Sequence, residues 1–217
     1  MRSTTSGISD LSSPDSTKVG AWLFRNRTSI PVPFAVALLL LPPSTHLLLT
    51  PIATGVILTI SGEALRLWAV HHIGVISRTR SDRLGPLVVS GPFGLCRNPL
   101  YVGNIAIWVG FALTARLVWM APVVLVLLAA EYYAIIRWEE TLLESRLGGS
   151  YRAYTAQVPR WLPGFHKKRA EVPTDGTAIS TASASRFSWR ETLFSERGTL
   201  IGMAVGYLLL WLKSFLL

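Results

Sequence analysis

The residues best suited to chemistry lie in two short segments, 97–101 (Arg-Asn-Pro-Leu-Tyr) and 137–140 (Arg-Trp-Glu-Glu). Asn followed by Pro is a start signal for a helix, and a helix start offers free amides and a positive dipole end to an anionic group. No Ser/His/Asp triad and no Gly-x-Gly motif is evident in the chain. The pattern therefore favours binding of a small charged molecule in a helical pocket.

Membrane helices must position these segments. Of the 217 residues, 50% are hydrophobic and only 15% are charged, whereas soluble domains carry about 25% charge. Backbone polar groups in lipid must be satisfied internally, so apolar stretches are expected to be helices. We expect an all-α, polytopic membrane helical bundle with about five transmembrane helices, over roughly 30–41, 46–71, 99–114, 119–137 and 199–216.

The third and fourth stretches predict a helical hairpin. They are separated only by a tight turn around Ala115 and Arg116. Because a hairpin returns to the side from which it started, Asn98 and Glu139 must lie at the same membrane depth and can be neighbours. The sequence thus places an amide-rich helix start beside an acidic helix end.

The basic residues predict the orientation. They gather before the first span, between the second and third, and between the fourth and fifth, and the two remaining loops contain only Arg116. The positive-inside rule makes the three basic segments cytoplasmic. We expect an integral inner-membrane protein with its N-terminus and active site in the cytoplasm. The net charge of +9 is then explained without nucleic acid as a partner.

Composition also divides the chain into parts. Three glycines spaced by four near the C-terminus, Gly198, Gly202 and Gly206, allow close helix packing against the same chain or in a homo-oligomer. The expected parts are a polar cytoplasmic segment (1–27), a membrane core (28–166), a cytoplasmic linker (167–198) and an additional transmembrane helix (199–217).

Three ionisable residues inside the expected spans, Glu63, Arg66 and Glu131, are candidates for contact with the acceptor. Glu63 and Arg66 stand three residues apart and can pair, either within a site or as a structural pair. Glu131 suits a general base, or a counter-charge to Arg66 or Arg116. A single cysteine and two adjacent histidines, which point in different directions on a helix, predict no metal site.

The ordered motifs resemble the isoprenylcysteine carboxyl methyltransferase family of integral membrane methyltransferases, related to phospholipid N-methyltransferases. The resemblance covers roughly residues 62–164. It rests on Gly-Pro-Phe-x-x-x-Arg-Asn-Pro-Leu-Tyr-Val-Gly (91–103), the hairpin, Glu-Glu (139–140), Gly-x-x-Tyr-x-x-Tyr (148–154) and Val-Pro-Arg (158–160).

This resemblance implies S-adenosylmethionine as the cofactor, bound in a cytoplasm-facing pocket. We expect Arg137 and Glu140 to be catalytic residues near the transferred methyl group. The cofactor-binding residues that the resemblance implies are Pro86, Leu87, Val88, Phe93, Asn98, Pro99, Leu100, Tyr101 and Glu139.

Two positions depart from the family pattern. Asn98 stands where the family most often has His, and Ile135 stands where eukaryotic members place an Arg that holds the substrate carboxylate. The methyl acceptor, a membrane lipid or lipophilic small molecule, therefore stays open between a carboxyl, an amine and a phospholipid headgroup. Two other functions stay open: an NADPH-dependent membrane reductase of the sterol-reductase type, whose terminal hairpin is related, and a non-catalytic membrane interaction protein.

Overall fold

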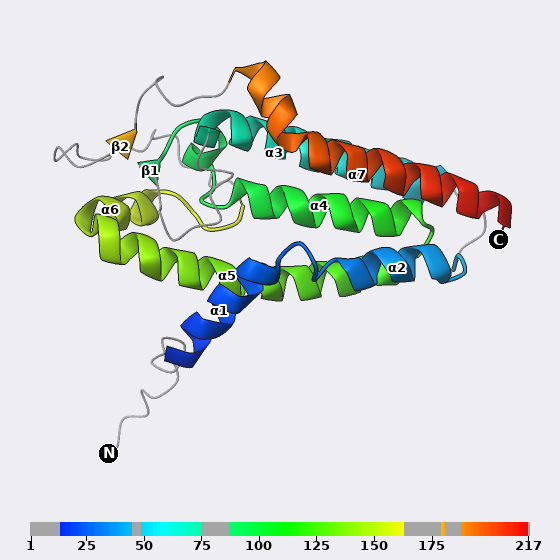
Figure 1. Cartoon of the computed structure of the whole chain (residues 1–217), viewed down its shortest axis with the longest axis horizontal. Helices are drawn as coiled ribbons and strands as arrows, with labels where there is room; N and C mark the ends of the chain where they lie inside the picture. The colour runs from blue at the N-terminus through cyan, green and yellow to red at the C-terminus, as the bar shows by residue number, and fades with distance from the viewer. Residues whose placement is uncertain (1–13, 45–48, 75–86, 163–178, 181–187, 217) are drawn as a thin grey trace, which may run out of the picture.

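The computed structural model describes residues 14–44, 49–74, 87–162, 179–180 and 188–216 (Figure 1). The described part is all-α, as expected, apart from two residue pairs in which Leu87 and Val88 lie parallel to Ile179 and Ser180. The elements are α1 (Pro14–Asn26), α2 (Val32–Leu40), α3 (Leu49–Ile73), β1 (Leu87–Val88), the short 3₁₀ helix η3 (Gly91–Gly94), α4 (Pro99–Thr114), α5 (Met120–Leu147), α6 (Gly149–Gln157), β2 (Ile179–Ser180) and α7 (Trp189–Leu216).

Three of the described helices, α3, α5 and α7, are long and apolar enough to cross a membrane, and α4 is a shorter apolar helix. The protein is thus an integral membrane protein with three candidate spans, where the sequence predicts about five. The first expected span contains only the nine residues of α2, about 14 Å of helix against a hydrocarbon core of about 30 Å. Pro31 precedes α2 and Pro42 follows it, and proline disfavours continuation of a helix.

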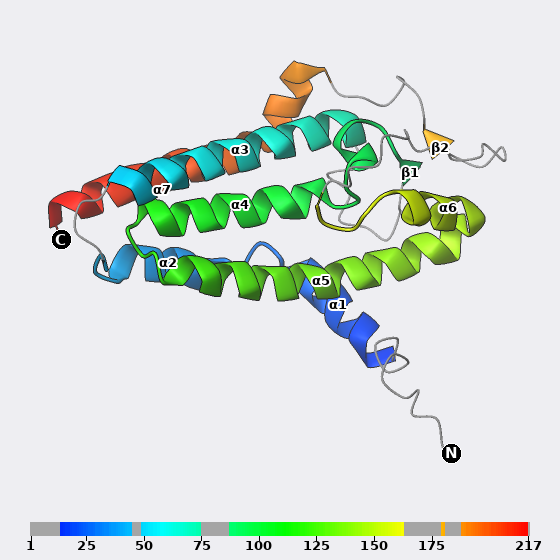
Figure 2. The ribbon, with the colours of Figure 1, turned by 180° about the vertical axis from the view of Figure 1, so that it is seen from behind.

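The helices are arranged around α4. In both views α4 lies between α3 and α5, α7 runs along α3, and α1 leaves the bundle at an angle (Figures 1 and 2). The elements α6, β1 and β2 gather at one end. At the other end the backbone amide of Ser44 donates to the carbonyl of Arg116, over 3.1 Å, in the turn of the α4–α5 hairpin.

Glycines bring α3 and α4 into backbone contact. A Cβ atom at Gly62 would lie 2.7 Å from the carbonyl oxygen of Gly103, and one at Gly55 would lie 2.5 Å from that of Gly110. Small residues are a common means of close helix approach in lipid. Of the three expected glycines of α7, Gly206 packs closely on α4, where a Cβ would lie 2.9 Å from a ring carbon of Phe111. A Cβ at Gly198 or at Gly202 would have no atom within 4 Å.

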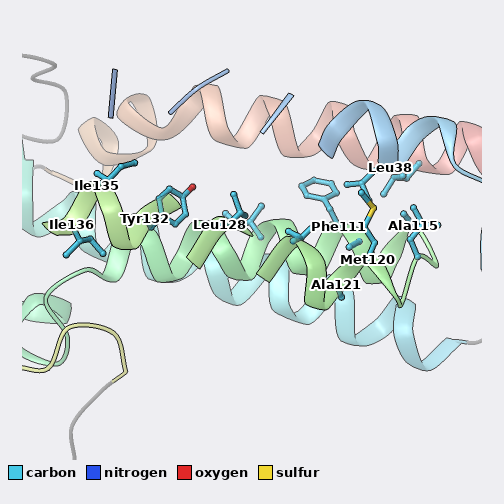
Figure 3. Close-up of a cluster of buried hydrophobic side chains, with 14 residues drawn as sticks. Leu38, Phe111, Ala115, Met120, Ala121, Leu128, Tyr132, Ile135 and Ile136 are labelled. Atoms are coloured by element: carbon cyan, nitrogen blue, oxygen red, sulfur yellow. The ribbon is translucent and has the colours of Figure 1, made fainter. Parts of the chain in front are cut away.

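The apolar core lies between α4, α5 and α2 (Figure 3). Leu128 and Ile135 of α5 are fully buried there, and Leu38 of α2 belongs to the same cluster, beside Phe111 and Met120. The far end of α7 joins this region through Lys213, whose ammonium donates to the carbonyls of Leu38 (2.7 Å) and Leu41 (2.5 Å). These bonds satisfy carbonyl groups at the end of α2, which have no partner within their own helix.

Helix α7 begins at Trp189, ten residues before the expected start of the last span. The reason is a capping box, in which the Ser188 hydroxyl and the Glu191 carboxylate bond reciprocally. The Ser188 backbone amide donates to the carboxylate over 2.7 Å, and the Glu191 amide donates back to the hydroxyl over 3.3 Å. The end of the expected linker is therefore helical.

The expected polar segment at the N-terminus also contains a helix. One side of α1 packs against α5, where Gly20 lies so close to Ala134 that a Cβ would be 2.5 Å from its carbonyl oxygen. The ring centroids of Phe24 and Trp138 lie 5.0 Å apart. This contact, which the sequence did not predict, brings the segment after α1 alongside α5.

Candidate functional site

A cavity of about 610 Å³ lies where the first turn of α4 meets the second half of α5. Its volume falls within the range of about 300–1,000 Å³ that is typical of small-molecule sites. Most of the expected cofactor-binding residues line it, as does Glu140. Those residues are Leu87, Val88, Phe93, Asn98, Pro99, Leu100, Tyr101 and Glu139.

Of the remaining expected site residues, only Arg66 lines the described part of the cavity. Pro86 lies outside the described residues. Among the described residues, Arg137 is not part of the cavity wall, and neither are Glu63 and Glu131; Arg66 is. The cavity thus gathers residues from both ends of the hairpin. It does not include Arg137, which was expected beside Glu140 at the transferred methyl group.

The two ends of the hairpin meet at Tyr101 and Glu139. The Tyr101 hydroxyl donates to Glu139 Oε1 over 3.0 Å. The Tyr101 ring also stacks on Tyr132 of α5, with centroids 4.7 Å apart. Asn98 and Glu139, which the hairpin predicts at the same membrane depth, line one cavity.

Two arginines clamp Glu140. The guanidinium of Arg160 donates to both carboxylate oxygens, from Nε over 3.0 Å and from Nη2 over 2.6 Å. Arg97 Nη1 lies 3.1 Å from Oε1 of the same carboxylate. Burial acts to lower the pKa of Arg160, but the hydrogen bonds and charge of Glu140 outweigh it and raise that pKa. Glu140 is thus held in a bidentate, charge-assisted pair, which indicates a positioning role.

The chain after α6 is fixed onto the start of α4. The Asn98 side-chain amide donates to the Arg160 carbonyl over 3.0 Å, and the Arg97 backbone amide donates to the Pro159 carbonyl over 2.9 Å. Asn98 makes no side-chain capping bond to its own helix. The first amides of a helix have no partner within it, so those of Leu100 and Tyr101 are suited to bind an anionic group in the cavity.

Tyr154 of α6 supports the loop that carries Phe93. Its hydroxyl donates to the Phe93 carbonyl over 2.7 Å, and burial raises the pKa of Tyr154 above its ordinary value. The phenol therefore remains a proton donor at neutral pH. Nearby Cys96 is buried, and burial also raises the pKa of its thiol, whereas a reactive cysteine needs a lowered one.

A second polar group lies in the same cavity wall around Arg66. Its guanidinium donates to Asn104 of α4 and to Glu196 and Thr199 of α7. The expected pair with Glu63 is present, with Arg66 Nε 3.4 Å from Glu63 Oε2. The guanidinium of Arg66 thereby links α3, its own helix, to both α4 and α7.

Sequence reasoning missed several of these residues. Glu196 lies 130 residues from Arg66, so no local pattern relates them. Arg27, from the segment between α1 and α2, also lines the cavity. To predict its position, the sequence reading would have had to recognise the helix at 14–26, which directly precedes Arg27. The carboxylate of Glu131 has no hydrogen-bond partner among the described residues, and Arg66 pairs with other carboxylates instead.

The chain resembles known proteins over this same region. The phospholipid methyltransferase family profile matches residues 50–149, which include the whole α4–α5 hairpin. In the described part of the chain, no group of three or more His, Cys, Asp or Glu side chains is placed to hold a metal ion. No solved structure matches the chain.

Three curated proteins are similar to it. The nickel-cobalt-cadmium resistance protein NccN of Alcaligenes xylosoxydans xylosoxydans is 32% identical over 106 residues, 49% of this chain and 46% of the relative. The cobalt-zinc-cadmium resistance protein CzcN of Cupriavidus metallidurans is 30% identical over 161 residues, 71% of this chain and 67% of the relative. The protein-S-isoprenylcysteine O-methyltransferase of Mus musculus is 31% identical over 129 residues, 55% of this chain and 44% of the relative. The chain thus spans about half of NccN and of the mouse enzyme, and two thirds of CzcN.

Proposed function

The chain belongs to the phospholipid methyltransferase family, and on this premise we propose that it transfers a methyl group from S-adenosylmethionine to a lipophilic acceptor. The observation that carries the proposal is the cavity in which the first turn of α4 and the acidic end of α5 converge. The hydrogen bond between Tyr101 and Glu139 joins these two ends.

The cavity residues fit the groups of the cofactor. Glu139 suits its ammonium or its ribose diol, and the amides of Leu100 and Tyr101 suit its carboxylate. Phe93, which lines the same cavity, offers an aromatic face to the adenine. When bound, S-adenosylmethionine supplies an electrophilic methyl group, which an acceptor lone pair takes as the carbon–sulfur bond breaks.

The protein's own contribution is positioning, which accounts for much of the acceleration in such transfers. The Glu140 carboxylate fixes Arg97 and Arg160, and Arg160 in turn holds Asn98 at the helix start. We therefore propose that Glu140 orients the cofactor end of the cavity without touching the transferred methyl group.

The acceptor is proposed to enter from the lipid. Apolar side chains of α2 and α4, among them Val32, Ala35 and Trp108, line the cavity together with the polar residues. The distribution of basic residues supports a cytoplasmic N-terminus and a cavity at the cytoplasmic face of the inner membrane.

Association of two chains through α7 is a further proposal. Gly198 and Gly202 face open space within one chain, which leaves room for a second copy.

The test is methyl transfer from labelled S-adenosylmethionine to a total lipid extract by the purified protein. Label in a lipid species, lost in Glu139→Ala and kept in Glu144→Ala, is the expected result; Glu144 is an exposed residue of the same helix. Oxidation of NADPH without transfer of label would favour a reductase. The absence of both activities, and of binding to either cofactor, would favour an interaction protein.

A further inference from the structure

We propose that Arg27, from the segment between α1 and α2, binds the carboxylate at the amino-acid end of S-adenosylmethionine, while Glu139 takes the ammonium group. This inference rests on the proposed function and adds a cofactor-binding residue to it. Arg27 lines the cavity together with Glu139 and Tyr101. The family profile begins at residue 50, so Arg27 and the helix before it lie outside the matched segment.

Most charged side chains of the cavity wall pair with one another. Among the described residues, the wall contains three arginines and three glutamates. Arg66 pairs with Glu196, and Arg97 Nη1 lies 3.1 Å from Glu140 Oε1. Arg160, behind the wall, donates to both oxygens of Glu140 as well. These two arginines and two glutamates of the wall therefore have partners within the protein, and they offer little to a charged ligand.

Arg27 and Glu139 are the two remaining charged residues of the wall, and neither forms an ion pair with another described residue. Glu139 accepts from the Tyr101 hydroxyl over 3.0 Å. The guanidinium carbon of Arg27 lies over the Phe24 ring, 4.1 Å from its centroid. The charge of Arg27 acts on both Glu139 and Tyr101, so the three side chains share one part of the cavity. A guanidinium and a carboxyl group placed in this way fit a zwitterion.

The amino-acid end of S-adenosylmethionine is a zwitterion of this kind. A guanidinium stays protonated in proteins, and its planar fork of donors matches a carboxylate. The amides of Leu100 and Tyr101 suit the same carboxylate, and Arg27 adds the positive charge that amides lack. Because Arg27 acts on Glu139 and Tyr101, which belong to the cofactor end of the cavity, the cofactor is favoured over an anionic acceptor as the source of the carboxylate.

The packing of α1 on α5 holds Arg27 in this position. Gly20 of α1 lies against the α5 backbone, and the Phe24 ring packs on Trp138 with centroids 5.0 Å apart. Trp138 directly precedes Glu139, and Phe24 carries the guanidinium of Arg27 on its ring. A continuous set of contacts therefore links Arg27 to the acidic end of α5. The helix that this chain adds before the matched segment thus has a role at the cavity.

The experiment compares S-adenosylmethionine with decarboxylated S-adenosylmethionine, which keeps the sulfonium and the ammonium but lacks the carboxylate. Calorimetric titration of the full-length protein in detergent at neutral pH gives both affinities. We expect the wild-type protein to bind the intact cofactor at least about tenfold more tightly, the effect of one charge-assisted pair. In Arg27→Gln this ratio should fall about tenfold, because affinity for the intact cofactor decreases while affinity for the decarboxylated compound does not. Arg25→Gln, an exposed arginine of the same helix, should keep the wild-type ratio.

Binding of the decarboxylated compound also shows that Arg27→Gln is folded. Equal affinity of the wild-type protein for the two compounds, or an unchanged ratio in Arg27→Gln, would overturn the role of Arg27 and leave the proposed function in place. A wild-type protein that binds neither compound would remove the proposed function and this inference with it. If Arg27→Gln does not fold, Arg27→Lys, which retains the charge, must still prefer the intact cofactor, and loss of that preference would contradict the proposal.

Discussion

The hydroxyl of Tyr101 donates to the carboxylate of Glu139 over 3.0 Å, across 38 residues of chain. Tyr101 belongs to the first turn of α4, and Glu139 lies in the second half of α5. This bond, together with the Arg97–Glu140 pair, joins the two ends of the hairpin where the cavity lies. It therefore links the membrane topology directly to the geometry of the candidate site.

Loss of the Tyr101 hydroxyl should weaken cofactor binding more than folding. In Tyr101→Phe the ring can still stack on Tyr132, but the Glu139 carboxylate loses the donor that orients it. We expect an affinity for S-adenosylmethionine about tenfold lower, measured by calorimetric titration, with a thermal midpoint close to that of the wild-type protein. Equal affinity of the two proteins would show that Tyr101 does not orient Glu139 for binding.

Removal of the Glu140 carboxylate should destabilise the protein. Glu140→Ala leaves Arg97 and Arg160, both largely buried, without their shared counter-charge, at a cost of about 2 kcal/mol. Thermal unfolding in detergent measures this change. Glu144→Ala is the control, because its pair with Arg152 is 53% and 68% exposed and is expected to contribute less than about 1 kcal/mol. Similar losses in both variants would contradict a special role for the clamp.

Substitution of a glycine between α3 and α4 should disturb both packing and the Arg66 group. In Gly103→Ala the new methyl group would lie 2.7 Å from the Gly62 carbonyl and 2.6 Å from Arg66 Cγ. We expect a loss of about 1–3 kcal/mol, seen as a lower thermal midpoint. Gly202→Ala, which meets no atom within 4 Å, should leave the single chain unchanged. A fully stable Gly103→Ala would show that the two helices can separate at no cost.

Alkylation of Cys96 should be slow in the folded protein. It is the single cysteine of the chain, and burial both restricts access and raises the pKa of its thiol. We expect iodoacetamide to react at pH 8 at least about tenfold more slowly than with the unfolded chain. The folded state holds the thiol proton more tightly than the unfolded chain does. Cys96 therefore contributes its full share to the free energy of unfolding below its ordinary pKa of 9.0, and this contribution decreases at higher pH. Rapid alkylation of the folded protein at pH 8 would contradict burial of this loop.

Local signals were sufficient for the hairpin and for one end of the cavity. Asn98 and Pro99 mark the start of α4, and the hairpin then determines that Glu139 returns to the same end. The pairing of Glu63 with Arg66 followed from their spacing on one helix. These relationships depend on residues that are close in sequence or joined by one turn.

The rest depends on tertiary contacts that no local pattern contains. The pair between Arg66 and Glu196 joins helices 130 residues apart, and α1 packs on α5 through Gly20. The start of α7 was the exception, because Ser188 and Glu191 form a recognisable capping box that the polar composition of the preceding segment obscured. The predicted number of about five spans exceeds the three candidate spans of the structure. One reason is that prolines flank α2 and limit it to nine residues.

The central claim is that the converging ends of α4 and α5 bind S-adenosylmethionine, and calorimetric titration of the wild-type protein and Glu139→Ala tests it most directly. We expect saturable binding to the wild-type protein, no detectable binding to a folded Glu139→Ala, and no binding of NADPH to either. Unchanged affinity in Glu139→Ala, or binding of NADPH in place of S-adenosylmethionine, would contradict it.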